Sequence, residues 1–256
     1  MEDLSALEKL LKSGEFLQSL QMERKTADLV FDSRTLNAIY ELVSRYRVDY
    51  IDYPISSGKE SIVFKAYLDG KAVAIKIYKM STLRFSNIWK YIDGDYRFSK
   101  EHLTRSSLVY LWARKEFTNL SECRRYRINA PRPIAFHKNL LMMSYLGTNT
   151  RGAPMLKDTD VDFQKTFDQI LYSVKELYGK AKLVHADLSE YNVLIYRAKP
   201  YLLDMAQSVS REHPAADYFL ERDIKNICIF FRKKGIDCTI EESLRYVKSS
   251  IKSGKA

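Results

Sequence analysis

Apolar side chains recur at helical spacing, three or four residues apart, along much of the chain. The pattern occurs in residues 3–20, 34–46, 104–127, 161–181 and 239–252. A sixth stretch has Pro214 near its start and Gly235 at its end. We expect Pro214 in the first turn of this helix, because proline fits there and glycine fits just past a helix.

In other stretches the side chains alternate in character at every second position, which is typical of β-strands and predicts β-hairpins. "ESIVFKAYL-DG-KAVAIKIYK" places two β-rich runs around Asp69-Gly70, a dipeptide typical of a tight primed turn. "PIAFHKNLLMMSYLG" predicts a strand, a turn at Lys138-Asn139, and a second strand that ends near Gly147. "VLIYRAKPYLLD" predicts another hairpin.

Two stretches lack a clean period. Residues 84–101 predict a long loop, and loops of that length are usually functional or mobile. Residues 148–160 have the composition of a linker. The predicted organisation is α+β with two lobes: an N-terminal helical extension at 1–49, a β-rich lobe at 50–146 and a helical lobe at 147–256.

The composition is that of a folded protein with a positive charge. Of the 256 residues, 46% are hydrophobic and 29% are charged, which argues against general disorder. Lys and Arg outnumber Asp and Glu by 42 to 32, a net charge of +10. That excess suits a polyanionic partner such as nucleic acid, and it also suits mere solubility.

The three cysteines are scattered and form no C-x-x-C pair, so neither a disulfide framework nor a zinc site is expected. The N-terminus is acidic and amphipathic, unlike a signal peptide, and no apolar run is long enough to span a membrane. We therefore expect a soluble, cytoplasmic protein.

The stretch most indicative of chemistry is "LVHADLSEYNVLIY", residues 183–196. It places His185, Asp187 and Asn192 in the pattern H-x-D-x-x-x-x-N, a spacing typical of protein-kinase-type phosphotransferases. Asp187 can orient an attacking hydroxyl, and Asn192 can offer a neutral oxygen to Mg²⁺. Asp204 ends the next apolar run and can add a carboxylate to the same ion. His185 fits a structural, hydrogen-bonded role better than that of a base.

A phosphate-binding segment is predicted at "SSGKESIVF", where Gly58 lets backbone amides approach phosphate oxygens. Ser56, Ser57 and Lys59 add donors, although such a sequence is also common in ordinary turns.

A phosphate-binding lysine is predicted in "VAIKIYK". Lys76 shares a sheet face with Ala74 and Tyr78, so it needs an anionic partner, whereas Lys71 and Lys79 fit a solvated face.

The partner of Lys76 is expected on the following helix. Glu116 is favoured, because it lies one turn after Trp112 and close to apolar Leu120. Glu101 and Glu122 are the alternatives.

Five segments together resemble the RIO family of atypical protein kinases, the type-1 branch in particular. They are "ISSGKESIVFKA", "AIKIYKMSTLRF", "YIDGDYRF", "LVHADLSEYNVL" and "LLDMAQSV…HPAADYFLERD". The type-2 branch typically reads H-G-D where this chain reads His185-Ala186-Asp187. The compact chain resembles archaeal members, and the resemblance covers about residues 50–235.

The resemblance implies a trimmed two-lobed protein-kinase-like fold without an activation loop, which binds ATP and Mg²⁺, with Mn²⁺ as an alternative. Asp187 would be the catalytic aspartate, and Asn192 and Asp204 the metal ligands. Asp204 would also accept the phosphoryl group in an ATPase reaction. The implied nucleotide-binding and supporting residues are Ser56, Ser57, Gly58, Lys59, Glu60, Val63, Lys76, Met143, Ser144 and Leu146, with Glu116 and Ser189 in support.

The resemblance also implies a flexible, autophosphorylated loop at about 84–107, with Ser99, Ser106 and Ser107 as candidate acceptors. Family members are associated with maturation of the small ribosomal subunit, which suits the net charge of +10. Ser61, Ser144 and Tyr145 depart from the usual family residues, which leaves nucleotide affinity open.

Two other functions fit the sequence. The H-x-D-x-x-x-x-N pattern also occurs in small-molecule kinases resembling aminoglycoside and choline phosphotransferases, although little chain remains after residue 205 for their larger helical lobe. Lysines and arginines gathered in 84–132 suit a non-catalytic rRNA-binding assembly factor.

Overall fold

The computed structural model describes residues 32–81, 88–98 and 104–254. The helix predicted at 3–20 lies outside these residues. The chain forms two compact units, the first being Met1–Asn87, His102–Phe117 and Pro133–Tyr145, and the second the remainder. The chain passes from the first unit to the second for the last time between residues 145 and 146, whereas the boundary expected from the sequence lies between 146 and 147. Residues 88–101 and 118–132 also belong to the second unit.

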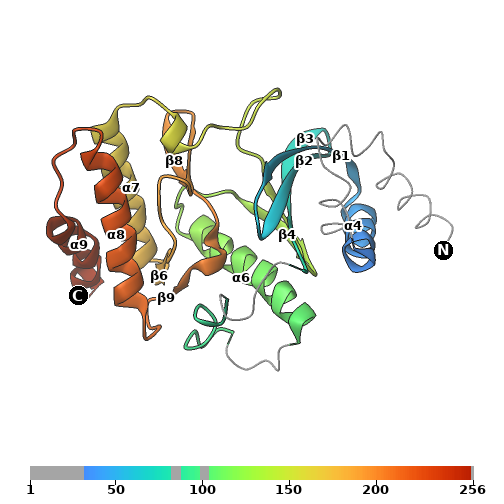
Figure 1. Cartoon of the computed structure of the whole chain (residues 1–256), viewed down its shortest axis with the longest axis horizontal. Coiled ribbons are helices and arrows are strands. Elements are labelled where there is room, and N and C mark those ends of the chain that lie inside the picture. Colours follow the sequence, from blue (N-terminus) through green and yellow to red (C-terminus); the bar gives the residue numbers. More distant parts are fainter. Residues whose placement is uncertain (1–31, 82–87, 99–103, 255–256) are drawn as a thin grey trace. The chain divides into compact units, whose positions relative to one another are not determined.

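The described part of the first unit contains an antiparallel sheet with helix α4 packed against it (Figure 1). The strand order is β1-β2-β3-β5-β4. The bounds are α4 Ser33–Tyr46, β1 Val48–Ser57, β2 Ser61–Leu68, β3 Lys71–Tyr78, β4 Pro133–His137 and β5 Leu140–Ser144. The predicted helix at 34–46 and both hairpins are confirmed, although β5 ends three residues before Gly147.

The turn at Asp69-Gly70 shows why the first hairpin was predictable. Both residues have positive φ, 50° and 69°, which is the backbone of a type I′ turn. The carboxylate of Asp49 accepts a hydrogen bond from the Gly70 amide at 2.9 Å, which ties the turn to β1.

The two faces of the sheet differ in chemistry. Phe64, Ile75 and Met142 lie on the face that packs with Leu36 and Ile39 of α4 into the hydrophobic core. Side chains alternate along a strand, so the residues between them lie on the opposite face. That second face carries Val63 of β2, Lys76 of β3 and Met143 of β5.

The second unit is mainly helical. Its long helices are α7 Phe163–Gly179 and α8 Ala216–Arg232, followed by α9 Ile240–Lys248. Helix α6, Arg105–Arg125, begins in the first unit and ends in the second. The predicted helices are confirmed with one correction: Pro214 precedes α8 by two residues, and Ala215 is the residue at its N-terminal cap.

Two small antiparallel pairs accompany these helices. β7 Val193–Tyr196 and β8 Lys199–Leu202 form the predicted hairpin. β6 Leu183–Val184 pairs with β9 Val209–Ser210, a contact between distant residues that local spacing could not predict. Short 3₁₀ helices occur at η1 Leu156–Asp158, η2 Met205–Gln207 and η3 Ser249–Gly254.

The described part of the predicted long loop, residues 88–98, is a series of compact turns. Ile88, Ile92, Asp95 and Phe98 are all buried. These residues form turns, as the predicted long loop implies, and they are closely packed. None of the described helices is both long and apolar enough to cross a membrane.

Candidate active site

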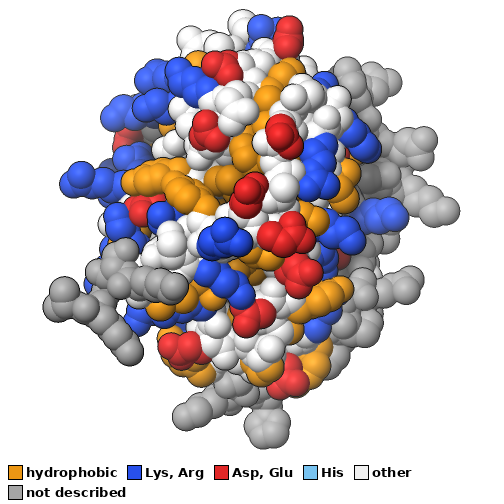
Figure 2. Space-filling model, turned by 90° about the vertical axis from the view of Figure 1, so that its left-hand side faces the viewer, with side chains coloured by type: hydrophobic (Ala, Val, Ile, Leu, Met, Phe, Trp, Pro, Cys, Tyr) orange, Lys and Arg blue, Asp and Glu red, His pale blue; other side chains and the backbone are white. Residues whose placement is uncertain are grey.

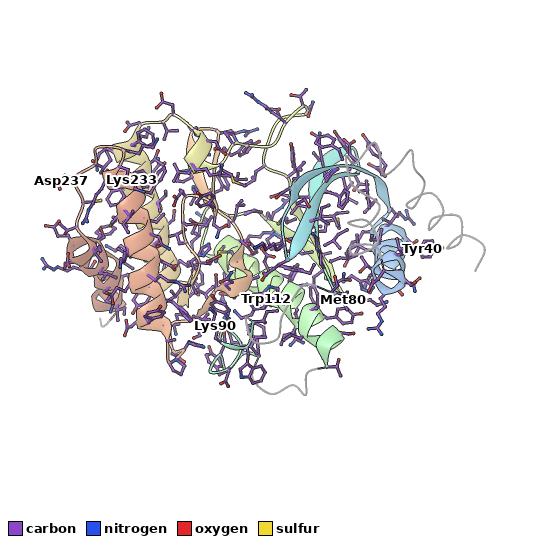
Figure 3. The ribbon with its side chains drawn as sticks, viewed as in Figure 1. Tyr40, Met80, Lys90, Trp112, Lys233 and Asp237 are labelled. Atoms are coloured by element: carbon purple, nitrogen blue, oxygen red, sulfur yellow. The ribbon has the colours of Figure 1, made fainter. Side chains whose placement is uncertain are left out.

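Lys76 forms a buried ion pair in the first unit. Its Nζ lies 3.0 Å and 2.9 Å from the two carboxylate oxygens of Glu116, and both side chains are almost fully buried. Tyr78 donates a further hydrogen bond to the same carboxylate. Trp112, labelled in Figure 3, is buried on α6, and Glu116 follows it by one turn of that helix. The structure therefore provides the anionic partner that the sequence required.

The predicted phosphate-binding segment joins β1 to β2 and is exposed at Ser56, Ser57, Gly58 and Lys59. The backbone amide of Gly58 donates a hydrogen bond to the carbonyl of Ser61 at 2.9 Å, which closes the turn between the two strands. A Cβ on Gly58 would meet only Ser61 O, at 3.7 Å, and its φ is not positive. The fold itself therefore does not require glycine here, and space is left beside the backbone.

Lys79 was expected on a solvated face, and that expectation is wrong. The side chain is buried, and its Nζ donates to the carbonyl of Gly58 at 2.6 Å. Burial lowers the pKa of Lys79. This lysine therefore fixes the β1–β2 turn, a role that the alternation of residues could not indicate.

Met143 is buried on β5, on the same sheet face as Lys76. Ser144 ends the strand. The carbonyl of Leu146 accepts a hydrogen bond from Ala153 N at 2.9 Å within the second unit.

The pattern around Asp187 forms a tight hydrogen-bonded loop in the second unit. The side-chain amide of Asn192 donates to the backbone carbonyl of Asp187 at 2.7 Å and to its carboxylate at 3.1 Å. Gln207 donates to the same carboxylate oxygen at 3.0 Å. The backbone amide of Asn192 donates to Ser189 O at 3.0 Å, so Ser189 shapes the turn between the two side chains.

Asp204 is brought to this loop by the backbone. Leu203 N donates to Asn192 O at 2.9 Å, which joins the strand end before Asp204 to the loop. Asp204 has φ 58° and ψ 56°, an unfavourable left-handed conformation for a non-glycine residue, and η2 begins directly after it. Such strain is typical of functional sites.

The donor set is compatible with Mg²⁺. Because the Asn192 amide nitrogen donates to Asp187, its carbonyl oxygen is the atom left to face a metal. Mg²⁺ is usually held by one or two protein oxygens together with substrate phosphates. Among the described residues there is no group of three or more His, Cys, Asp or Glu side chains that could hold a metal alone.

His185 is buried below this loop, and its Nε2 lies 2.8 Å from the carbonyl of Leu203. Burial lowers the pKa of His185 to about 4, although the carboxylate of Asp204 opposes the change. The imidazole is therefore neutral at neutral pH. It acts as a hydrogen-bonded support, which agrees with the structural role expected from the sequence.

A buried aspartate that the sequence reasoning did not single out holds the other side of the loop. Asp223 of α8 accepts hydrogen bonds from Ala186 N at 2.7 Å and Leu188 N at 2.9 Å, and Arg222 donates to Ala186 O. Burial raises the pKa of Asp223 to about 7. Its position, 36 residues after Asp187 in the chain, gave no local signal.

The remaining candidates divide between described and undescribed residues. Ser106 Oγ accepts a hydrogen bond from Arg34 at 2.5 Å, and Ser107 bonds to Thr104 at the start of α6. Glu122 pairs with Arg125 at 3.9 Å, not with Lys76. Ser99 and Glu101 lie outside the described residues.

The sequence is similar to one known protein family along most of its length. Residues 62–244 match the RIO domain. The chain is 48% identical to the RIO-type serine/threonine-protein kinase Rio1 of Thermoplasma acidophilum over 73% of this chain and 99% of the relative. It is 40% identical to Rio1 of Methanocaldococcus jannaschii over 93% of this chain and 81% of the relative.

The fold is also similar to a solved structure. The Rio2 kinase of Chaetomium thermophilum, in an ADP/Mg²⁺-phosphoaspartate complex, superposes with a TM-score of 0.64 at 21% identity, covering 86% of this chain and 70% of the Rio2 chain. This likeness supports the trimmed kinase-like α+β fold. The matched domain, the archaeal relatives and the fold agree: the chain belongs to the RIO family and is an enzyme of the RIO kinase type.

Proposed function

We propose that this enzyme transfers the γ-phosphoryl group of ATP with Mg²⁺ bound at Asn192 and Asp204. The observation that carries the proposal is the Asp187–Asn192 loop. Its hydrogen bonds fix the Asp187 carboxylate and leave the Asn192 carbonyl oxygen as the side-chain atom available to a cation. A preorganised loop of this kind suits a reaction that depends on positioning and charge stabilisation.

The residues of the first unit supply the phosphate contacts in this proposal. Lys76 binds phosphate oxygens while Glu116 holds its ammonium group in place. The exposed residues 56–59 surround the phosphates, and Glu60 and Val63 continue that surface into β2. Met143 and the backbone of Ser144 and Leu146 contact the adenine; since the Leu146 carbonyl is already bonded to Ala153, its N–H is the group offered.

Asp187 and Asp204 carry the chemical steps. Asp187 accepts the proton of a serine hydroxyl as the hydroxyl oxygen attacks the γ-phosphorus and the bond to ADP breaks. Alternatively, a carboxylate oxygen of Asp204 attacks the γ-phosphorus, and the bond to ADP breaks. Water then hydrolyses the resulting acyl phosphate, which releases free phosphate and restores the carboxylate. The bound cation supplies stabilisation of the charge on the phosphate oxygens.

We further propose a cytoplasmic role in small ribosomal subunit maturation. The family resemblance and the net charge of +10, which suits an rRNA surface, support it. Autophosphorylation at Ser99, Ser106 or Ser107 belongs to the same proposal. All three cysteines are buried and free, as expected in a reducing compartment.

The test is ADP formation with ATP and Mg²⁺. Asp187→Ala should lower the rate by about 10²–10⁴, since a positioned acid–base group is lost. Asp160→Ala, an exposed aspartate of the same unit, is the matched control and should retain the parent rate. Hydroxylamine treatment of the ³²P-labelled protein distinguishes acyl phosphate at Asp204 from phosphoserine. Equal rates in the parent and Asp187→Ala would refute the proposal.

A further inference from the structure

Three polar side chains connect the 88–98 segment to the residues that follow Asp204. Asp95, in the turns of the segment, is completely buried. Its two carboxylate oxygens accept hydrogen bonds from Arg97, at 2.8 Å from Nε and 2.6 Å from Nη2. This bidentate geometry is the strongest form of an arginine–carboxylate pair and fixes the plane of the guanidinium.

Arg97 in turn fixes the orientation of a buried asparagine on α6. The Nη1 of Arg97 donates to Asn119 Oδ1 at 2.9 Å. Because Oδ1 faces the arginine, the amide nitrogen of Asn119 must point the other way. It donates to the carbonyls of Met205 at 2.8 Å and Ser208 at 3.0 Å.

Those two carbonyls belong to the first residue of η2 and the residue just past it, and Asp204 is the residue before η2. Asn119 therefore bonds the turn immediately after the strained Asp204 backbone. Strained residues persist only where the surrounding structure fixes them more than once. Leu203 N, bonded to Asn192 O, fixes Asp204 from its other side.

The 88–98 segment is anchored at further points to the same part of the chain. His213 Nε2 lies 2.7 Å from Asp93 O, and Ser210 N donates to Asp95 at 3.3 Å. Gly94 has φ +85°, and a Cβ there would lie 2.7 Å from Cδ of Pro214. The segment is thus closely packed against residues 210–214.

We propose that Arg97 and Asn119 are positioning residues for the metal ligand Asp204. Asp95 orients Arg97, Arg97 orients Asn119, and Asn119 holds the turn that presents the Asp204 carboxylate. The inference rests on the proposed metal role of Asp204. It assigns to the 88–98 segment a part in metal affinity, although no residue of the segment binds the ion.

The test is the Mg²⁺ concentration that gives half-maximal ADP formation. Partners that orient a metal ligand typically affect metal affinity by 10–100-fold when removed. Asn119→Asp, which cannot donate to the two carbonyls, and Arg97→Gln should each raise this concentration by about 10-fold. Arg97→Lys, which keeps the charge beside Asp95, should raise it less. Arg125→Gln, an exposed arginine on the same helix as Asn119, should leave it unchanged.

Two further readouts separate positioning from a purely structural role. Binding of a fluorescent ADP analogue in EDTA should stay within about two-fold of the parent, while the Mg²⁺ requirement changes. A purely structural role would lower the melting temperature and the active fraction but leave the half-maximal Mg²⁺ concentration as in the parent. That result would overturn the inference. Should Arg97→Gln fail to fold, Arg97→Lys and Asn119→Asp decide the question.

Asp204→Asn in the same assay separates this inference from the proposed function. If Asp204→Asn raises the Mg²⁺ requirement and the Arg97 and Asn119 variants do not, only the positioning role fails. If Asp204→Asn leaves the requirement unchanged, the metal role of Asp204 itself fails.

Discussion

Lys76 is a buried cation beside a buried carboxylate, and this pairing has a measurable consequence for stability. Its Nζ lies 2.9 Å from Glu116, with side-chain exposures of 6% and 1%. Removing one member of such a pair leaves the other charge buried without compensation, which typically costs about 3–5 kcal/mol. Removing both charges costs much less.

Glu116→Gln should therefore lower the free energy of unfolding by about 3–5 kcal/mol in urea titrations. Lys76→Met combined with Glu116→Gln should recover most of that loss. Glu41→Gln is the control: its carboxylate pairs with Lys138 at an exposed site, where about 1 kcal/mol or less is expected. A double variant as unstable as the single Glu116 variant would contradict this interpretation.

The buried His185 should make the free energy of unfolding depend on pH, and the direction of its pKa change sets the sign. Its pKa is lowered by burial from 6.5 to about 4, so between these values the unfolded chain binds a proton that the folded chain does not. The contribution of the neutral imidazole to stability is therefore present above pH 6.5 and is lost as the pH falls toward 4. Over this pH range the loss in the free energy of unfolding amounts to about 3 kcal/mol.

The measurement compares unfolding free energies of the parent and His185→Asn from pH 7 to pH 4. Asp223, whose pKa is raised to about 7 by burial, has the opposite pH dependence, but it is present in both proteins and cancels in the difference. The parent should lose more stability than the variant on acidification. Parallel curves would show that His185 does not titrate as its burial requires.

Contacts of single residues were predictable where a short sequence pattern singled them out. The ion pair of Lys76 with Glu116 is confirmed, and the spacing of Asp187 and Asn192 does bring these two side chains together. Lys79, Asn119 and Asp223 were not found. Their partners lie 21 to 89 residues away in the chain, and a polar residue looks the same in sequence whether it is solvated or buried in a network.

At the scale of elements, the loop between β6 and β7 contains a residue in the left-handed backbone conformation. Ala186 has φ 64°, and its amide and carbonyl are bonded to Asp223 and Arg222 of α8. The left-handed conformation costs an L-residue about 1–2 kcal/mol, whereas glycine adopts it freely.

Ala186→Gly should leave stability unchanged or raise it by up to about 1 kcal/mol, because relief of strain is partly offset by the greater entropy of the unfolded chain. Ala113→Gly, in the middle of α6, should instead lose about 1 kcal/mol or more. Thermal unfolding of both variants is the measurement. An equal loss in both would mean that the loop is not strained at Ala186.

The elements themselves were largely predictable because their signals are local. Apolar spacing located α4, α6 and α7, and alternation with turn residues located the β2–β3, β4–β5 and β7–β8 hairpins, whereas strand β1 was not predicted. The β6–β9 pair and the packed 88–98 segment were not predictable. Both depend on contacts with residues 205–214, which come more than 20 positions later in the chain.

At the scale of the whole molecule, the site residues divide between the two compact units. Lys76, Glu116 and residues 56–60 belong to the first, and Asp187, Asn192 and Asp204 to the second. The face seen in Figure 2 carries Lys and Arg interspersed with Asp and Glu, without a large patch of one sign.

We propose that Lys76 contacts the phosphates of ATP and that Asn192 and Asp204 hold its Mg²⁺ ion. The most direct test of this proposal is a crystal structure with a non-hydrolysable ATP analogue and Mg²⁺. We predict that the ion contacts Asn192 Oδ1 and the Asp204 carboxylate at about 2.1 Å. We also predict that Lys76 Nζ lies within hydrogen-bonding distance of a phosphate oxygen. A nucleotide bound away from Lys76, or an ion that contacts neither Asn192 nor Asp204, would contradict the account.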